Sequence, residues 1–120
     1  MISGIKSVVL DTNALLMPFQ FNINLDHEIR QLLGDVEVLV PSCVIAELKK
    51  LKVKESGGAL SLAGKYKEVS TSRRGDEGVV EAAKEHRAAV VTNDQELISI
   101  LRKLSIPVIR MRECQRLDFA

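Results

Sequence analysis

The chain has 120 residues, of which 46% are hydrophobic and 28% charged, and its formal net charge at pH 7 is +1. This composition is typical of a globular protein, and a net charge so close to zero excludes binding to polyanions by overall charge alone. The apolar runs are too short for a membrane span. No linker or repeat divides the sequence and no apolar export segment is visible, so we expect one domain over residues 1–120 and a cytoplasmic location.

Short apolar stretches are predicted to be strands. They are rich in Val and Ile and do not alternate strictly with polar residues, as expected for strands that are buried on both faces. The five ranges are 7–11, 36–40, 67–70, 88–92 and 107–111.

Helical patterns fill the intervals between these stretches. Asp26 and Ser42 are expected to cap the helices that follow them, and a glycine pair at 57–58 is expected to precede a short helix. The regular alternation predicts an α/β domain with three layers, in which helices cover both faces of a central parallel sheet of about five strands. The remaining predicted helices span 27–33, 43–54, 77–87 and 95–104.

Acidic residues lie where the predicted parallel strands end, which is the edge at which ligands bind in such folds. The first strand ends in Asp11, and the fourth runs into Thr92, Asn93 and Asp94. Glu47 lies in the helix after the second strand, at the border of its apolar stripe, where a charged side chain can face a cleft. Asp76 lies at the start of the helix before the fourth strand.

Most of these acids also have a purely structural interpretation. Asp11, Asp76 and Asp94 could each cap the N-terminus of a helix, and Asn93 with Glu96 forms a capping-box pattern. The cap interpretation weakens for the set as a whole, because separate segments deliver carboxylates to the same edge of the sheet.

Carboxylates that share one cleft need a cation. Two of them about 4 Å apart repel by about 4 kcal/mol at an effective dielectric of 20. Mg²⁺ or Mn²⁺ suits a set of oxygen ligands and also takes a substrate phosphate. The cysteines and histidines do not have the spacing of a zinc site. The pattern therefore predicts metal-dependent cleavage of a phosphodiester.

Taken in order, the segments "VVLDTNALL", "VPSCVIAELKKL", "GDEGVVEAA" and "AAVVTNDQEL" resemble the successive acidic motifs of PIN-domain ribonucleases. The resemblance covers nearly the whole chain and implies a sheet ordered 3-2-1-4-5, with Mg²⁺ or Mn²⁺ at its C-terminal edge. The resemblance also implies that four acids bind the metal, namely Asp11, Glu47, Asp76 and Asp94. The polar residues expected to support them are Asn13, Thr92 and Asn93.

Three features of the sequence resemble one branch of that family, the small-subunit ribosomal RNA-processing nucleases, in an archaeal form. These features are Pro18, the Pro-Ser-Cys turn at 41–43 and the closing segment 107–117. They look less like the toxin members of toxin–antitoxin pairs. Glu77 stands where the branch has the second Asp of a pair, and we interpret it as charge at a helix start.

The leading hypothesis is an RNA endonuclease that acts on a ribosomal RNA precursor and leaves a 5′-phosphate and a 3′-hydroxyl, as the resemblance implies. Alternatives are an RNA-binding assembly factor that cuts weakly and a toxin-type ribonuclease. A phosphotransfer domain is disfavoured, because Asn13 stands where such a phosphatase has a second acid. Ribosome-assembly factors and a second copy of the chain are the candidate protein partners.

Basic residues gather in a few stretches of the chain, of which 49–54 and 73–74 are the candidates for RNA binding. They could position an RNA backbone, although such a run is also typical of a solvated helix face. Aromatic residues make up only 3% of the sequence, which argues against base stacking. The predicted RNA-binding residues are Lys49, Lys50, Lys52, Lys54, Arg73 and Arg74.

Overall fold

The structure is a computed structural model that describes residues 4–120, so residues 1–3 of the predicted domain lie outside the described part. One sheet has the strand order β3-β2-β1-β4-β5-β6, and β1 to β5 are parallel. The predicted order 3-2-1-4-5 is therefore confirmed. Each predicted strand is present to within one residue at either end: β1 Ser7–Leu10, β2 Glu37–Pro41, β3 Lys67–Val69, β4 Ala89–Val91 and β5 Val108–Arg112.

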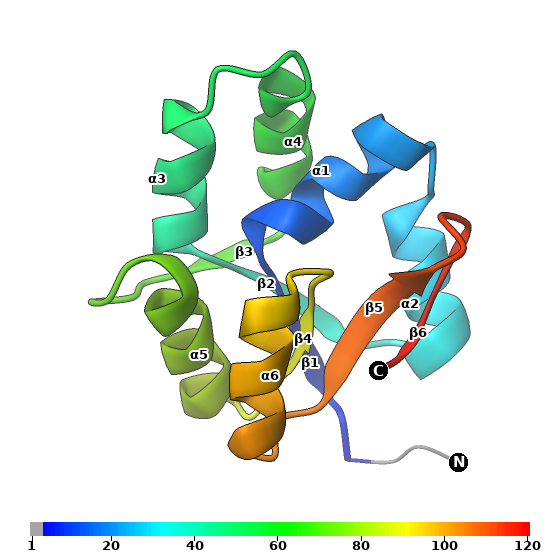
Figure 1. The fold of residues 1–120 in the computed structure, drawn as a ribbon, viewed down its shortest axis with the longest axis vertical. Coiled ribbons are helices and arrows are strands. Elements are labelled where there is room, and N and C mark those ends of the chain that lie inside the picture. Colours follow the sequence, from blue (N-terminus) through cyan, green and yellow to red (C-terminus); the bar gives the residue numbers. More distant parts are fainter. Residues whose placement is uncertain (1–3) are drawn as a thin grey trace.

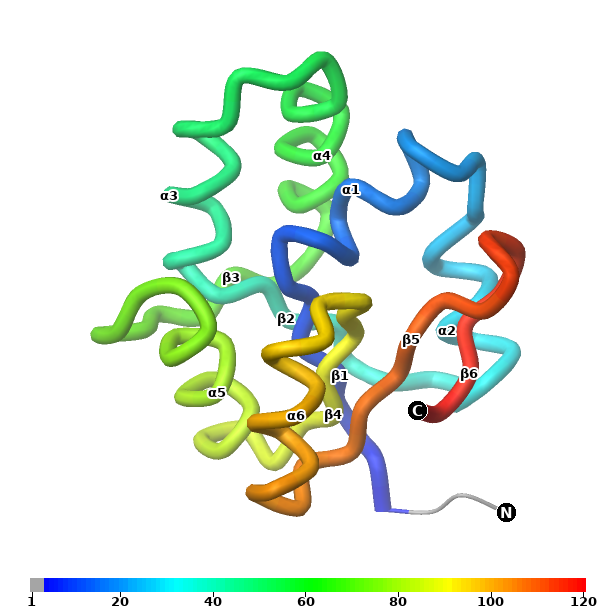
Figure 2. The backbone as a smooth tube through the Cα atoms, viewed as in Figure 1, coloured from blue at the N-terminus to red at the C-terminus, as the bar shows by residue number. Residues whose placement is uncertain are grey.

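The sixth strand, β6 (Arg116–Phe119), was not predicted; it pairs antiparallel with β5. Its hairpin turns at Glu113 and Cys114, both with positive φ, a conformation usually supplied by Gly or Asn. Because neither Gly nor Asn stands at these two positions, the sequence does not indicate a hairpin here. Figure 2 shows the hairpin beside α2 (Leu25–Leu33), where the Leu117 amide donates a hydrogen bond of 3.1 Å to Glu28 Oε1.

Helices cover both faces of the sheet, as predicted. In Figure 1, α5 and α6 stand in front of the strands, while α1, α3 and α4 gather beyond the ends of β1 and β2. Strands β1 and β4 are buried at every position, which requires cover on both sides. Within residues 4–120 no helix is long and apolar enough to cross a membrane. The remaining helices are α1 Thr12–Phe21, α3 Ser42–Lys50, α4 Ser56–Ala63, α5 Gly75–His86 and α6 Gln95–Lys103.

Two predicted caps are wrong. Asn24, not Asp26, caps α2, since its side chain accepts a hydrogen bond from the His27 amide. Ser42 is already inside α3, and its hydroxyl instead accepts from the Thr71 amide at 3.0 Å. Helix α3 also ends at Lys50 rather than at residue 54, because the chain becomes extended at the next residue.

The glycine pair at 57–58 was predicted to precede a short helix, and this is wrong: both glycines lie inside α4. A side chain at Gly58 would collide with the ring of Phe19, whose nearest atom lies 2.7 Å from the position of a Cβ. Gly58 thus permits α1 and α4 to approach closely. Sequence alone could not distinguish this role from a helix break.

Candidate active site

The predicted acids share one cavity at the C-terminal edge of the sheet. Its volume is about 140 Å³, and Asp11, Glu47, Asp76 and Asp94 all line it. They come from the β1–α1 junction, α3, α5 and the β4–α6 junction. The other lining residues are Thr12, Asn13, Leu16, Gly75 and Val79.

Asp11 lines this cavity and is held in place by the start of α1. Its side chain is buried, and its Oδ1 accepts a hydrogen bond of 2.8 Å from the Ala14 amide, which makes it the N-cap of the helix. The pKa of Asp11 is raised to about 7: burial is the largest cause and the charges of Asp94 and Asp76 add to it, while hydrogen bonds from Thr92 and Ala14 oppose the rise. The carboxylate is therefore costly to ionise.

Asp94 is the N-cap of α6. Its Oδ1 accepts hydrogen bonds from the Glu96 amide at 2.9 Å and the Leu97 amide at 3.3 Å. Thr92 is fully buried and links the two strand-end acids: its hydroxyl donates to Asp11 and its Oγ1 accepts from the Asp94 amide at 3.0 Å. A change at Thr92 would therefore disturb both acids.

The capping-box interpretation of Asn93 and Glu96 is wrong, because the helix begins one residue later than that pattern requires. Asn93 Oδ1 instead accepts a hydrogen bond of 2.8 Å from the Met111 amide. This bond fastens the loop after β4 to β5, next to the residues that carry the acids.

Glu47 reaches the cavity from α3 and is exposed. Its Oε1 accepts a hydrogen bond of 2.7 Å from the hydroxyl of Thr12, the first residue of α1. Thr12 was not predicted to support the site. Its position next to Asp11 was the only indication in the sequence, and the partner 35 residues away could not be found without the fold.

Asp76 is the second residue of α5 and not its cap, so the cap interpretation is wrong for this acid. It is half-buried. Burial raises its pKa, and the negative charges of Asp94, Glu96 and Glu47 raise it further. Three carboxylates thus oppose its ionisation, including Glu96, which the sequence indicated only as part of a capping-box pattern with Asn93.

The packing of α5 against α3 depends on Gly78. A Cβ at this position would collide with Cys43 Sγ of α3 and lie 2.6 Å from the carbonyl oxygen of Arg73. Gly78 therefore permits the close approach that brings Asp76 of α5 and Glu47 of α3 to the same cavity.

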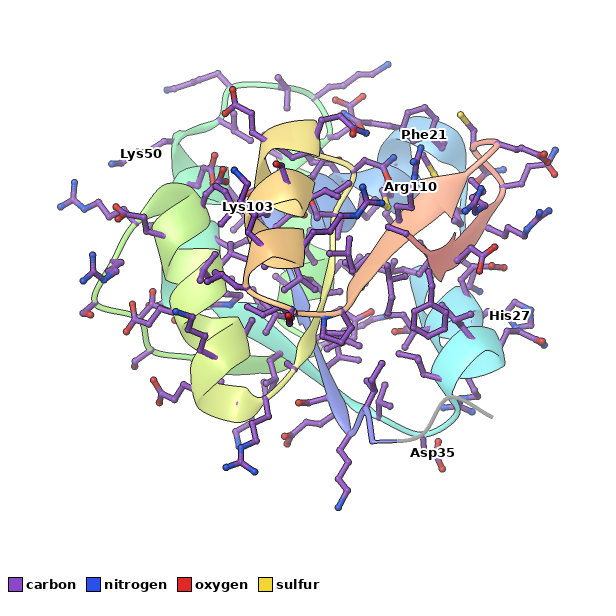
Figure 3. All side chains as sticks on the ribbon, turned by 60° about the horizontal axis from the view of Figure 1, so that its bottom comes forward. Phe21, His27, Asp35, Lys50, Lys103 and Arg110 are labelled. Atoms are coloured by element: carbon purple, nitrogen blue, oxygen red, sulfur yellow. The ribbon has the colours of Figure 1, made fainter. Side chains whose placement is uncertain are left out.

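The predicted RNA-binding residues lie in three different settings. Lys50 and Arg74 line a second cavity of about 290 Å³ together with Glu47 and Gly75, so this cavity adjoins the acids. Figure 3 shows Lys50 at the margin of the molecule, extending outward. Arg73 instead pairs with Glu77 at 3.5 Å on the surface. The lysines that are exposed but line neither cavity are Lys49, Lys52 and Lys54.

The chemistry of the four acids and their shared location both suit a divalent cation. All the donors are carboxylate oxygens in one cavity, and their mutual repulsion contributes to the raised pKa of both Asp11 and Asp76. A bound cation would remove that repulsion. Within residues 4–120, however, no three side chains of the ligating types converge closely enough to hold an ion. Binding would require these carboxylates to move toward one another.

The fold and the cavity define an α/β domain with a carboxylate-lined pocket at the end of its parallel strands. Comparison with known families identifies it further: the profile of the PIN like domain family matches residues 8–114. The chain belongs to this family.

Known relatives are consistent with this assignment. The chain is 35% identical to ribonuclease VapC4 of Methanocaldococcus jannaschii, with 88% of this chain and 90% of the relative covered. It is 29% identical to ribonuclease VapC9 of Archaeoglobus fulgidus, with 93% and 87% covered. The solved structure of the PIN domain endonuclease Utp24 superposes with a TM-score of 0.82 at 26% identity, covering 94% of this chain and 90% of that one.

Proposed function

We propose that residues 1–120 act as one PIN domain, a cytoplasmic endoribonuclease that hydrolyses RNA phosphodiester bonds with Mg²⁺ or Mn²⁺. The observation that carries the proposal is the single cavity in which Asp11, Glu47, Asp76 and Asp94 meet, with the pKa of two of them raised. Clustered carboxylates that resist ionisation are poor structural elements and suit a cation site. The VapC ribonucleases and the Utp24 endonuclease support an RNA substrate.

Each proposed ligand is positioned by a neighbour. Helix caps orient Asp11 and Asp94, and Thr12 orients Glu47. When bound, the cation would lower the pKa of a water molecule and neutralise charge on the phosphate. Asp76, the acid in the first turn of α5, would complete the ligand set or accept a hydrogen bond from the attacking water.

The surrounding residues would hold the substrate. Lys50 and Arg74, in the cavity beside Glu47, would bind backbone phosphates, which fixes the position of the strand without reading its sequence. Asn13 at the cavity wall, and Thr92 and Asn93 behind it, would keep the acids in place.

For the substrate we propose a ribosomal RNA precursor, with ribosome-assembly factors as partners and a homodimer as the working form. The resemblance of Pro18, residues 41–43 and residues 107–117 to the ribosomal RNA-processing branch supports the choice of substrate. The similarity to the PIN domain endonuclease Utp24 over 94% of the chain supports nuclease activity. The second candidate is a toxin-type ribonuclease, which the two VapC relatives favour. The two candidates differ in substrate and not in the chemistry of the site.

A circular RNA tests the activity, because it has no ends and can be opened only by an endonuclease. The purified chain should linearise it in Mg²⁺ or Mn²⁺ and not in EDTA, leaving a 5′-phosphate. A Glu47→Gln variant prepared in parallel controls for contaminating nuclease and should be inactive. Salt-dependent binding of the circle without cleavage in either metal would overturn the endonuclease proposal and favour the weakly cutting assembly factor.

A further inference from the structure

Arg110 on β5 has an environment unlike that of every other cation in the described chain. It is half-buried, whereas every other arginine and lysine in residues 4–120 is exposed. Its Nε is buried and, within the same residues, has no hydrogen-bond partner. Burying a guanidinium donor without an acceptor is costly, and arginine cannot escape the cost by losing its proton. An acceptor from another molecule would remove the penalty.

The sheet register aligns Arg110 with the acid site. Leu10 lies beside Val91, and Val91 beside Ile109. One residue further along, Asp11 and Thr92, just past the ends of β1 and β4, continue this alignment to Arg110 of β5: the Asp11 amide donates to the Val91 carbonyl and the Thr92 amide to the Ile109 carbonyl. Aligned residues of parallel strands point to the same face, and neighbouring strands are about 4.8 Å apart, so the backbone of Arg110 lies about 10 Å from that of Asp11. Figure 3 shows Arg110 on the side of β5 toward α6 and α1.

The carboxylate opposite Arg110 in the hairpin is engaged elsewhere. Asp118 of β6 lies opposite Arg110 in the hairpin, so both side chains point to the same face. Asp118 Oδ2, however, pairs with Arg112 Nε at 3.1 Å, and its Oδ1 accepts from the Phe119 amide at 2.8 Å. The guanidinium of Arg110 therefore keeps donors for an external anion.

We propose that Arg110 binds a phosphate of the RNA next to the one that is cleaved, on the β5 side of the acid cavity. The inference rests on the RNA substrate proposed above. Lys50 and Arg74 lie beside Glu47, on the α3 side of the same cavity. Arg110 lies in the opposite direction along the sheet, beyond β4. A strand held at both places would cross the acids between them.

The test measures binding of a fluorescently labelled single-stranded RNA in EDTA, where no cleavage occurs, over a series of salt concentrations. Arg110→Gln should weaken binding about tenfold and reduce the slope of log affinity against log salt by about 0.7, the value for one lost phosphate contact. Arg110→Lys should retain the salt dependence of binding, because the positive charge remains. It should lose part of the affinity, because the ammonium group cannot donate the bidentate hydrogen bonds of a guanidinium. Arg102→Gln, an exposed change on α6, should behave as wild type.

Thermal unfolding distinguishes phosphate binding by Arg110 from a purely structural role of this residue. If Arg110→Gln lowers the melting temperature and leaves RNA affinity and salt slope unchanged, Arg110 serves only the hairpin and the inference is wrong. The same holds if Arg102→Gln loses as much affinity as Arg110→Gln. Arg110-dependent binding by a protein that opens no circular RNA would contradict the proposed nuclease activity while leaving the phosphate contact of Arg110 standing. Absence of RNA binding by the wild type would overturn both.

Discussion

The hydroxyl of Thr12 donates a hydrogen bond of 2.7 Å to Glu47 Oε1 and so joins the first turn of α1 to the second turn of α3. Because Asp11 caps the same end of α1, two acids from different strand–helix units are fixed to a common point. The bond lies at the surface, so its net contribution to stability is small, about 0.5–1 kcal/mol. Its main effect is on the position of the Glu47 carboxylate.

Replacing Thr12 by Val should therefore reduce activity more than stability. The change preserves the shape of the side chain and removes the donor, leaving Glu47 free to turn toward solvent. We expect the single-turnover rate of RNA cleavage to fall about tenfold, equivalent to about 1.4 kcal/mol, with little change in the melting temperature. Thr12→Ser, which retains a hydroxyl, should recover most of the rate. A Thr12→Val rate equal to that of wild type would exclude the orienting role.

The raised pKa of Asp11 makes stability depend on pH. The unfolded carboxyl ionises near 3.8, whereas the folded one ionises near 7, so the folded state binds more protons between these values. The free energy of unfolding therefore falls as pH rises from about 4 to 7, by up to about 4 kcal/mol from this group. Urea unfolding of the metal-free protein across this range measures the slope.

Asp11→Asn should remove that contribution, because the amide retains an acceptor for the Ala14 amide and carries no charge. At pH 8 without metal, the variant should be more stable than wild type. Asp35→Asn, at an exposed position between α2 and β2, is the matched control and should leave the slope unchanged. A wild-type stability that rises between pH 4 and 7, matched by Asp11→Asn, would show that Asp11 is not strained.

Divalent metal should reverse the order of stability. A ligand that binds only the folded state at 100 times its dissociation constant adds about 2.7 kcal/mol. Wild type should gain this amount in Mg²⁺ or Mn²⁺, while Asp11→Asn, which lacks one charged ligand, should gain less. Thermal unfolding at increasing metal concentration makes the comparison. Equal gains by both proteins would place the cation elsewhere.

Gly78→Ala should damage the fold and the site together. The new methyl would meet Cys43 Sγ and the backbone of Arg73, and backbone cannot move aside as a flexible side chain can. We expect a loss of about 1–3 kcal/mol in the free energy of unfolding, typical of overpacking. Gly57→Ala is the control: it lies in α4 with nothing within 4 Å of the new methyl, and should be neutral or slightly stabilising. A Gly78→Ala protein as stable as wild type would mean that α5 can shift without cost.

The fold was predictable because its strands are short, apolar and regularly separated by helices. The hairpin of β6 was not, since the turn at Glu113–Cys114 takes positive φ without Gly or Asn. Caps were uncertain for a related reason: Asn24 and Asp26 are equally good capping residues, and only the final path of the chain selects one.

For the site, capping a helix and lining the cavity are not alternatives. Asp11 and Asp94 cap helices and line the cavity at the same time, because a capping carboxylate at the end of a parallel strand already faces the sheet edge. What sequence could not supply were the partners far along the chain. Thr12 with Glu47, and Gly78 with Cys43, meet only when α3 and α5 pack.

The most direct test compares cleavage of circular RNA by wild type with that by four single variants, Asp11→Asn, Glu47→Gln, Asp76→Asn and Asp94→Asn, each shown to be folded by thermal unfolding. If these acids form one hydrolytic site, all four rates should fall by at least about 100-fold, and the exposed Asp35→Asn control should match wild type. Loss of activity in only one variant, or rates equal to that of wild type in all four, would contradict the account. In that case the carboxylates would be helix caps and surface charges that share a cavity without sharing a reaction.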